Sequence, residues 1–225
     1  SFSDTVPSKE LDEFVLKAIR VTENSPVAHE DILKEELEKI NHGVDIPILL
    51  DQATSVVTTS DAGAGVGYTG IRVRGSDATR VNVTINGIPL NDSESQGTFW
   101  VDLPDLSSST NDIQIQRGVG TSTNGAGAFG ASINLSTFNI VDASSPYGEI
   151  SNSFGSFNTQ KNTLKLGTGL IDGKWNFEGR LSRIVSDGFI DRASADLNSY
   201  YLSGTYLGKK SSIRAIAFSG HETTY

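Results

Sequence analysis

From about Pro146 onward the chain consists of short segments in which apolar and polar side chains alternate, and this pattern constrains the fold more than any other feature. A period of two places successive side chains on opposite faces of a strand, whereas a helix needs a period of about 3.6. The apolar members of the segments are Leu164, Leu166, Leu170, Trp175, Phe177, Leu181, Tyr200, Leu202 and Tyr206. Short turns at Asp172-Gly173 and 208–211, with a longer polar connection at 186–197, predict an antiparallel meander.

Two kinds of protein use such a meander. A transmembrane barrel turns its apolar face to lipid and spans the bilayer with strands of about 9–11 residues. A soluble antiparallel sheet alternates in the same way but turns its apolar face inward. Trp175, Tyr200 and Tyr206 are expected near strand ends, where an aromatic girdle would lie. The alternation leaves both alternatives open, and the polar content opposite each apolar face favours the membrane.

Residues 1–140 predict a small mixed α/β unit. Leu33, Leu37 and Ile40 recur with helical spacing, so we expect a helix over 30–41, ended by Gly43. The other expected elements are a short helix from Asp45-Ile46-Pro47, strands at 56–57, 71–74 and 81–85, a tight turn at Asn86-Gly87, and a helical turn at 103–106.

Composition excludes several classes of protein. The chain has no cysteine, so it holds neither a disulfide nor a thiolate metal site. A net charge of −9 argues against a nucleic-acid partner, which needs clustered Lys and Arg. No apolar run reaches the roughly 18 residues of a spanning helix, and no signal peptide is present. Because the sequence has no methionine, we expect it to be part of a longer reading frame.

The sequence matches to enzymatic motifs lack the neighbouring structure that the chemistry of each motif requires. Residues 65–70 match GxGxxG, but a dinucleotide site needs a helix next, and 71–74 alternate like a strand. The three histidines, His29, His42 and His221, are far apart in the sequence. No nucleophile elbow is present. We therefore expect no enzyme, no cofactor and no metal site.

The stretch from Ile113 to Thr137 joins two strand-like runs by a glycine-rich loop. Its glycines are Gly118, Gly120, Gly125, Gly127 and Gly130. Glycine permits positive φ angles and close approach of another surface. The stretch is therefore expected to fit beneath another part of the protein.

Two segments, GIRVRGSDATRVNVTINGIPLND (70–92) and IQIQRGVGTSTNGAGAFGASINLST (113–137), together resemble the plug domain of TonB-dependent outer-membrane receptors. The chain departs from the family pattern at Val119, Asn124-Gly125 and Ala131, and none of these departures removes the small-residue character that the loop needs. LDEFVLKAIR (11–20) is similar to the family's TonB box, with Lys17 in place of a small polar residue.

The resemblance implies a fold and a domain organisation. Residues 1–22 would be a flexible segment carrying the TonB box, and 23–142 an α+β plug domain. Residues 143–225 would be the first five or so strands of an antiparallel transmembrane β-barrel, incomplete here because the family barrel has about 22 strands. The TonB box itself would comprise Glu13, Phe14, Val15, Leu16, Lys17 and Ala18.

The resemblance also implies a function. A receptor of this kind imports a scarce solute across the outer membrane of a Gram-negative bacterium, with an iron–siderophore complex as the leading expectation. Its partners would be TonB with ExbB and ExbD, the lipid bilayer, and the extracellular ligand. Import of a glycan, a vitamin or haem is an alternative, and so is a structural subunit of an outer-membrane assembly that has lost transport.

Two sets of site residues follow from the positions of the matching motifs. The substrate-binding set is Tyr68, Asp77, Thr79, Arg80, Asn91, Asp92, Glu94, Gln96, Phe99 and Trp100, although Phe99 and Trp100 could equally pack against the barrel wall. Arg74 and Arg117 resemble the arginines that anchor the plug to glutamates of the barrel wall, and Glu178 is a candidate partner. The alternative is an ordinary exposed strand arginine.

Overall fold

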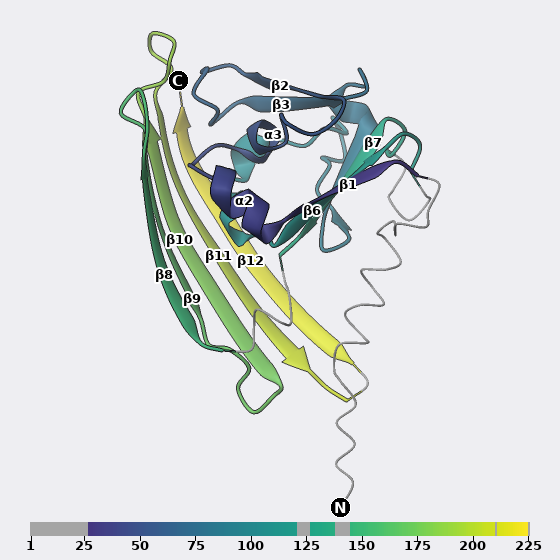
Figure 1. The fold of residues 1–225 in the computed structure, drawn as a ribbon, viewed down its shortest axis with the longest axis vertical. Coiled ribbons are helices and arrows are strands. Elements are labelled where there is room, and N and C mark those ends of the chain that lie inside the picture. The colour runs from purple at the N-terminus through teal and green to yellow at the C-terminus, as the bar shows by residue number, and fades with distance from the viewer. Residues whose placement is uncertain (1–26, 121–126, 138–144, 210, 225) are drawn as a thin grey trace, which may run out of the picture.

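The computed structural model describes residues 27–120, 127–137, 145–209 and 211–224. The predicted TonB box, Gly125 and the predicted boundary between 142 and 143 lie outside these residues. The described chain forms two bodies that pack together (Figure 1). We call residues 27–120 and 127–137 the plug, and the curved sheet formed by 147–224 the wall sheet.

The wall sheet contains five antiparallel strands in the order β12-β11-β10-β9-β8. Each strand pairs with its neighbour in sequence, so the sheet is the predicted meander. The strands are β8 (Tyr147–Phe154), β9 (Gln160–Gly167), β10 (Trp175–Ser186), β11 (Ala195–Leu207) and β12 (Ser212–Thr224).

The two faces of the wall sheet decide between the alternatives that the alternation left open. Large apolar side chains of one face point away from the plug and are exposed, as for Leu166 at 55% and Leu181 at 59%, whereas a few others, such as Ile184 and Leu197, are buried on the plug side. Its polar face, with Thr163, Asn176 and Arg180, is buried on the side where the plug lies. A soluble sheet packs its apolar face inward, so this arrangement identifies barrel strands with an apolar outer surface.

The aromatic girdle is only partly as predicted. Trp175 opens β10 and packs against Tyr206 near the end of β11, with ring centroids 4.6 Å apart and the rings tilted by 46°. Tyr200 lies in the middle of β11, which corrects its expected place near a strand end. Its period-two phase is correct, because it is exposed on the outer face.

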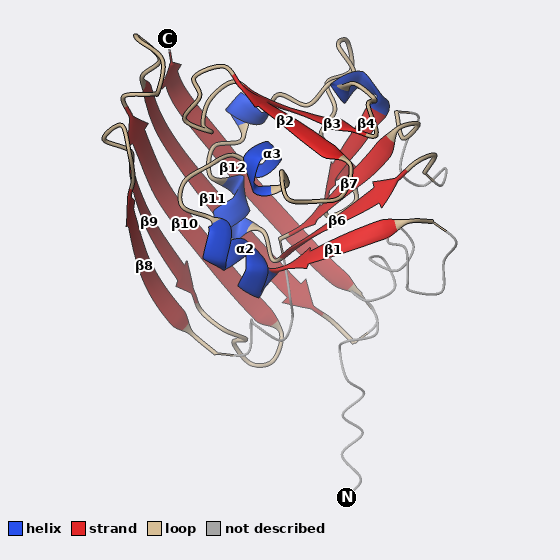
Figure 2. Ribbon diagram, turned by 45° about the horizontal axis from the view of Figure 1, so that its top comes forward, coloured by secondary structure: helices blue, strands red, loops and turns tan. Residues whose placement is uncertain are grey.

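The plug is built on a second sheet in the order β1-β6-β7-β4-β5, shown in Figure 2. Its strands are β1 (His29–Leu33), β4 (Val81–Ile85), β5 (Ile88–Pro89), β6 (Asp112–Arg117) and β7 (Ala131–Ser136). Only β4 and β7 pair in parallel. A separate ladder joins β2 (Val56–Ser60) to β3 (Thr69–Val73), so a strand follows the GxGxxG match as predicted.

The Asn86-Gly87 turn between β4 and β5 has the predicted geometry. Asn86 has φ 49° and Gly87 φ 83°, the positive pair that a two-residue hairpin turn requires. Asn86 accepts these angles more readily than a branched residue would.

The first predicted helix is correct only in its second half. Residues 29–33 form β1, and α2 is confined to Lys34–Ile40. The physical reason is tertiary: β6 offers β1 a ladder in which Ile32 faces Ile113, and this pairing overrides local helix propensity. The short helix α3 (Ile46–Leu49) begins as predicted, with Pro47 in its first turn.

The remaining helical elements are single 3-10 turns, η1 (Ala78–Arg80), η2 (Trp100–Asp102) and η3 (Leu106–Ser109). Across the described parts of the chain, no helix is long and apolar enough to cross a membrane. The helical turn predicted at 103–106 is wrong except at Leu106, because η2 ends at Asp102 and η3 begins at Leu106.

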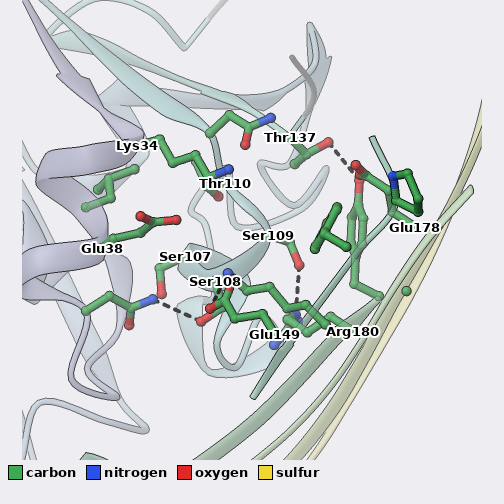
Figure 3. Close-up of a pocket in the computed structure, with 18 of the residues that line it drawn as sticks. Lys34, Glu38, Ser107, Ser108, Ser109, Thr110, Thr137, Glu149, Glu178 and Arg180 are labelled. Carbon is green, nitrogen blue, oxygen red and sulfur yellow. Dashed lines mark hydrogen bonds and ion pairs between the residues drawn. The ribbon is translucent and has the colours of Figure 1, made fainter. Parts of the chain in front are cut away.

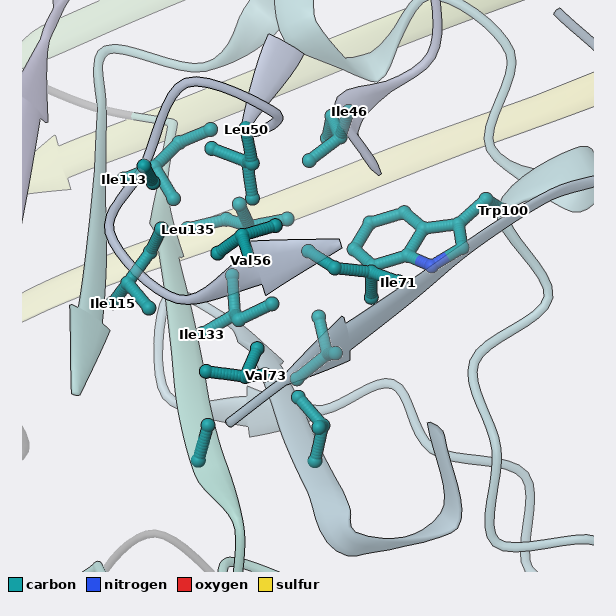
Figure 4. Close-up of a cluster of buried hydrophobic side chains, with 14 of the residues drawn as sticks. Ile46, Leu50, Val56, Ile71, Val73, Trp100, Ile113, Ile115, Ile133 and Leu135 are labelled. Atoms are coloured by element: carbon teal, nitrogen blue, oxygen red, sulfur yellow. The ribbon is translucent and has the colours of Figure 1, made fainter. Parts of the chain in front are cut away.

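The plug core lies between the sheet and the β2–β3 ladder (Figure 4). Ile113, Ile115 and Ile133 are fully buried on the central strands. Trp100 packs in the same cluster, near Ile71. Burial of large side chains such as these contributes about 1.5–3 kcal/mol each, so the cluster is the main source of plug stability.

Candidate functional site

The plug meets the wall sheet at Asp105, the residue before η3. Asp105 is 2% exposed and has a left-handed backbone with φ 53°. Short polar side chains tolerate this conformation better than most non-glycine residues. The turn directs the carboxylate from the plug toward β9 and β10, where two cationic side chains of the wall sheet meet it.

Both carboxylate oxygens of Asp105 are satisfied. Lys161 of β9 lies 2.8 Å from Oδ1, and a guanidinium nitrogen of Arg180 of β10 lies 2.9 Å from Oδ2. The hydroxyl of Ser108 donates to Oδ1 at 2.6 Å. Thr163 and Ser182 of the wall sheet donate to Oδ2. We call these six residues the Asp105 network.

The network binds plug and wall sheet through charge. Burial alone would raise the pKa of Asp105, but the adjacent charges of Lys161 and Arg180 outweigh it and lower that pKa. The carboxylate is therefore ionised at neutral pH. A buried ion cluster adds little net stability over apolar packing, but removal of one partner is costly, because it leaves the other charges buried and unpaired.

Beside the network lies a cavity of ≈ 300 Å³ between plug and wall sheet, shown in Figure 3. One side is α2, with Lys34 and Glu38, and η3 contributes Ser107. The opposite side is the wall sheet, with Glu178 and Arg180 among its lining residues. The cavity therefore carries both signs of charge, beside apolar side chains such as Leu37.

The predicted anchor Arg117 has a different partner from the one expected. Its guanidinium lies 2.8 Å from Glu30 of β1, and the same carboxylate oxygen accepts from the backbone of Thr54. This pair is internal to the plug, so the suggested pairing with Glu178 is wrong. The cause is β1, which the sequence patterns assigned to a helix. Arg74 is exposed, with φ 52°, and a contact of either arginine with a barrel wall stays a prediction.

The sequence patterns missed Asp105. Its signal is weak: one aspartate before Leu-Ser-Ser-Ser, in a turn that was expected for other reasons. Arg180 precedes the apolar Leu181, and Lys161 shares the period-two phase of Thr163 and Lys165, which alternate with Leu164 and Leu166. Their inward direction was therefore predictable, but their convergence on one plug residue was not.

The predicted substrate-binding residues do not gather in one place. Tyr68 lies beyond the end of the β2–β3 ladder where Ser60 pairs with Thr69, whereas Asp77, Thr79 and Arg80 follow its opposite end. A five-residue ladder separates these ends by about 13 Å. Tyr68 is exposed and lines a hollow of ≈ 150 Å³ together with Ile190 and Thr224 of the wall sheet and its loop.

The loop at 91–99 uses part of its polar content for its own structure. Asn91 accepts from the backbone of Val83 and donates to the carbonyls of Val81 and Gln96. Asp92 accepts from the backbone of Glu94 and Ser95, and these bonds hold its pKa below the ordinary value. The side chains that stay exposed for a solute in this loop are those of Asp92, Glu94, Gln96 and Phe99.

Trp100 is buried in the plug core at 3% exposure, which corrects its assignment as a substrate contact. The large apolar ring of Trp100 packs against Ile71 and its neighbours inside the plug, and this burial fixes the position of the side chain. Asp77 and Thr79 belong to a small cap, in which Asp77 accepts from the backbone and hydroxyl of Thr79.

A second buried carboxylate, Asp45, lies at the start of α3 and is 5% exposed. It accepts a hydrogen bond of 2.9 Å from the hydroxyl of Thr69. Burial raises its pKa to about 8, and the nearby negative charge of Glu222 adds to the rise. Asp45 is therefore predominantly protonated at neutral pH, the opposite state from Asp105.

Comparison with known families decides the class of the chain. Residues 21–132 match the TonB-dependent Receptor Plug Domain. The chain belongs to the TonB-dependent receptors. It consists of the plug domain and antiparallel barrel strands that follow it. No curated protein matches the chain by sequence.

Solved receptors share this fold. The pyoverdine outer membrane receptor FpvA from Pseudomonas aeruginosa PAO1 is 15% identical with a TM-score of 0.71, over 88% of this chain and 28% of that one. The siderophore receptor PirA from Acinetobacter baumannii is 18% identical with a TM-score of 0.65, over 94% and 33%. The copper transporter OprC is 12% identical with a TM-score of 0.67, over 86% and 30%. The chain thus spans about a third of the length of these receptors or less.

Proposed function

We propose that this TonB-dependent receptor imports a scarce solute, an iron–siderophore complex, across the outer membrane of a Gram-negative bacterium, with the plug closing the barrel lumen. The observation that carries the proposal is the Asp105 network, in which a plug carboxylate is buried between cations on the inner face of the wall sheet. A plug attached in this way blocks the space that the wall sheet curves around, and passage requires part of it to move.

Energy for that movement would come from TonB with ExbB and ExbD. Residues 13–18 would pair as an added strand with TonB, a mode in which backbone hydrogen bonds supply the affinity. Residues 1–22 would then be the segment that transmits force, 23–142 the plug domain and 143–225 the start of the barrel. Arg74 and Arg117 keep the proposed role of plug–barrel anchors, in addition to the pair that Arg117 forms with Glu30 inside the plug.

Solute contact is proposed for the exposed members of the predicted set. They are Tyr68, Asp77, Thr79, Arg80, Asp92, Glu94, Gln96 and Phe99, whereas Asn91 is half-buried and bonded within its loop. Structures named for siderophore uptake, such as PirA and the ferric yersiniabactin uptake receptor FyuA from Yersinia pestis, support an iron chelate as the solute class. The copper transporter OprC supports the inclusion of copper among the solutes tested.

Deletion of residues 13–18 from the full-length receptor tests the proposal. Uptake by a strain that lacks its own copy is measured over a panel of ferric siderophores, haem, cobalamin, glycans and copper. We expect uptake of one solute to be lost while binding of that solute to intact cells is kept. Unchanged uptake and growth would contradict active transport and favour a structural role in an outer-membrane assembly.

A further inference from the structure

Residues 61–68 join β2 to β3 and contain the first part of the GxGxxG match. We call them the β2–β3 loop. The loop lies against the C-terminal end of β12, with Gly67 beside Glu222 (Figure 1). Val66 is 1% exposed and packs with buried residues of β10 and β11. The loop is therefore a contact between plug and wall sheet that is separate from the Asp105 network.

Two glycines let the loop fit closely between its neighbours. Gly65 has φ 76° and Gly67 has φ 88°, in the left-handed region where most other residues are strained. A Cβ at Gly65 would lie 3.0 Å from Val44 of the plug, and one at Gly67 would lie 3.2 Å from a carboxyl oxygen of Glu222. The glycines of the match therefore serve the packing of the loop between plug and wall sheet.

Asp45 holds this loop from the plug side. Its backbone N–H donates to the carbonyl of Gly65 at 2.8 Å, and its carboxyl accepts from the hydroxyl of Thr69, the residue after the loop, at 2.9 Å. The backbone of Gly67 adds a further hydrogen bond to the carboxyl. Because Asp45 is 5% exposed, water competes little for these bonds. They connect the loop to the start of α3.

Glu222 faces the loop from the wall sheet. Both of its carboxyl oxygens are buried and have no hydrogen-bond partner among the described residues, and Asp102 of η2 faces it in turn. Among those residues the charged groups that act on Asp45 are Glu222 and Asp105, and Glu222 has the larger effect. Both are acidic, so a negative charge on Asp45 would be repelled across the loop. The close fit of the loop therefore favours an uncharged Asp45.

The loop also carries Tyr68, one of the predicted solute contacts. Tyr68 is 57% exposed and lines the hollow of ≈ 150 Å³ together with Ile190, which lies between β10 and β11. In the same connection, the backbone N–H of Phe189 donates to the carbonyl of Ala62 at 3.2 Å. Plug and wall sheet each contribute one side of the hollow, so its shape depends on how the β2–β3 loop lies against the wall sheet.

We propose that Asp45 is a positioning residue for solute binding, which holds the β2–β3 loop against the wall sheet and thereby places Tyr68 beside Ile190. The inference rests on the proposed transport function and adds a residue that touches no solute but sets the geometry of a solute contact. Because the pKa of Asp45 is raised to about 8, the loop and its solute contact should weaken as the pH rises through that value.

Two buried valines give a matched test of the loop that needs no solute. Val66 of the loop and Val81 of β4 are each 1% exposed, but Val81 lies in the plug core. Val66→Cys and Val81→Cys each introduce one thiol into a segment without cysteine. The purified full-length receptor is treated with iodoacetamide at pH 7 and pH 9. Each labelling rate is divided by that of free cysteine at the same pH, which removes the titration of the thiol itself.

We expect the corrected labelling rate of Val66→Cys to rise about tenfold between these pH values, because the ionised fraction of Asp45 rises from about one-tenth to nine-tenths. Asp45→Asn should abolish the rise. Asp51→Asn should keep it, because Asp51 also accepts from a threonine hydroxyl, that of Thr58 at 2.8 Å, but is exposed. Persistence of the rise in Asp45→Asn, an equal rise at Val81→Cys, or no rise at all would overturn the inference.

Removal of one hydroxyl gives a second test at a single pH, which does not depend on the titration of Asp45. Thr69→Val deletes the donor to Asp45 and keeps the side-chain shape, and Thr58→Val does the same to Asp51. At pH 7 the first variant should raise labelling of Val66→Cys about fivefold, as for the loss of one buried hydrogen bond, and the second should not. Equal labelling in the two variants would show that Asp45 does not hold the loop.

Solute binding connects the loop to the proposed function. The probe is the ferric siderophore that the uptake panel selects, loaded with radioactive iron, and its dissociation constant is measured at pH 7 and pH 9. We expect a rise of about tenfold in the unmodified receptor and none in Asp45→Asn, because the apparent constant is divided by the fraction of receptor that can bind. The same rise in both receptors would overturn the inference.

Failure of the inference and failure of the proposed function give different results. If cells take up no solute of the panel, the proposed function fails, and the solute role of Asp45 fails with it. The labelling of Val66→Cys then still decides whether Asp45 holds the loop. If uptake proceeds and the dissociation constant does not respond to Asp45→Asn at either pH, the transport function stands and the positioning role of Asp45 is wrong.

Discussion

Residues 28–41, which we call the β1–α2 arm, and η3 are held in the plug by different physical means. η3 is joined to the wall sheet by a carboxylate that is 2% exposed and bonded to two cations. The arm is an edge strand and a seven-residue helix with one buried side chain. Its ion pair is internal to the plug and partly exposed to solvent.

This difference predicts that η3 stays attached to the wall sheet under conditions in which the β1–α2 arm is released. Buried charges that lose a partner are costly, so η3 should stay attached until the plug as a whole gives way. Exposed pairs contribute little, so the arm depends mainly on Leu37, on the ladder with β6 and on the hydrogen bonds of Asn41 with Ser108 and Lys161. The arm is the first described element after the predicted TonB segment, which ends at Ala18. A force applied there reaches the weaker attachment first.

The largest expected effect comes from Asp105→Ala, which leaves Lys161 and Arg180 buried without their carboxylate. Loss of one member of a buried ion cluster costs about 3–5 kcal/mol. The midpoint and slope of denaturant unfolding of the full-length receptor measure the change. Asp77→Ala, at an exposed cap, is the matched control and should cost less than about 1 kcal/mol. If the two variants lost the same free energy of unfolding, the Asp105 network would not hold η3 more firmly than the arm is held.

Leu37→Ala should have the next largest effect. Leu37 is 1% exposed and is the only buried residue of α2, and removal of such a side chain costs about 2–5 kcal/mol. The loss should be local, with faster hydrogen exchange at 34–41 and unchanged exchange at 106–109. Ile40→Ala, at 39% exposure, should change little. Faster exchange at 106–109 in Leu37→Ala would show that arm and η3 open together.

Asp45 should make plug stability depend on pH. Its folded pKa of about 8 exceeds the ordinary 3.8, so the folded plug binds more protons between these values. The contribution of Asp45 is fully present below about pH 4 and is lost as the pH rises toward 8. Asp105 contributes in the opposite sense, because its lowered pKa gives stability that is lost in acid.

Asp45→Asn should therefore remove part of the decline in stability between about pH 6 and 8, on the order of 2 kcal/mol. Denaturant unfolding at several pH values measures this difference. The same slope in the variant and the parent would show that Asp45 is already ionised in the folded plug. A matched substitution at exposed Asp77 should leave the slope unchanged between these pH values.

The smallest effect is expected for Arg117→Ala. The bond to Glu30 lies near the surface, where an ion pair contributes about 0.2–1 kcal/mol. Its loss should loosen β1 and raise hydrogen exchange at 28–33 without a change in β7. Unchanged protection throughout the plug would refute a role for Arg117 in holding the arm.

The sequence predicts the features that repeat along the chain. Period-two alternation indicates the strands of the wall sheet, and the Asn86-Gly87 turn indicates the β4–β5 hairpin. These features depend on local geometry. The division of residues 30–41 between β1 and α2 was not predictable in this way, because the ladder with β6 joins positions more than 80 residues apart, as in the pair Ile32 and Ile113.

The candidate site was harder to predict than the fold for the same reason. Asp105, Lys161 and Arg180 come from three separate elements, and only the packing of plug on wall sheet brings them together. Trp100 was instead assigned to the site although it lies in the core, because its place in an expected solute loop suggested a surface contact. The structure instead uses its apolar ring in the core.

Hydrogen exchange of the full-length receptor, resolved to short peptides, tests the central claim most directly. The account predicts that amides of 28–41 exchange well before those of 104–111, and that Asp105→Ala removes this order by releasing η3. Exchange of 104–111 at the same rate as 28–41 in the unmodified receptor, or before it, would contradict a plug that is anchored at η3 and opens at the β1–α2 arm.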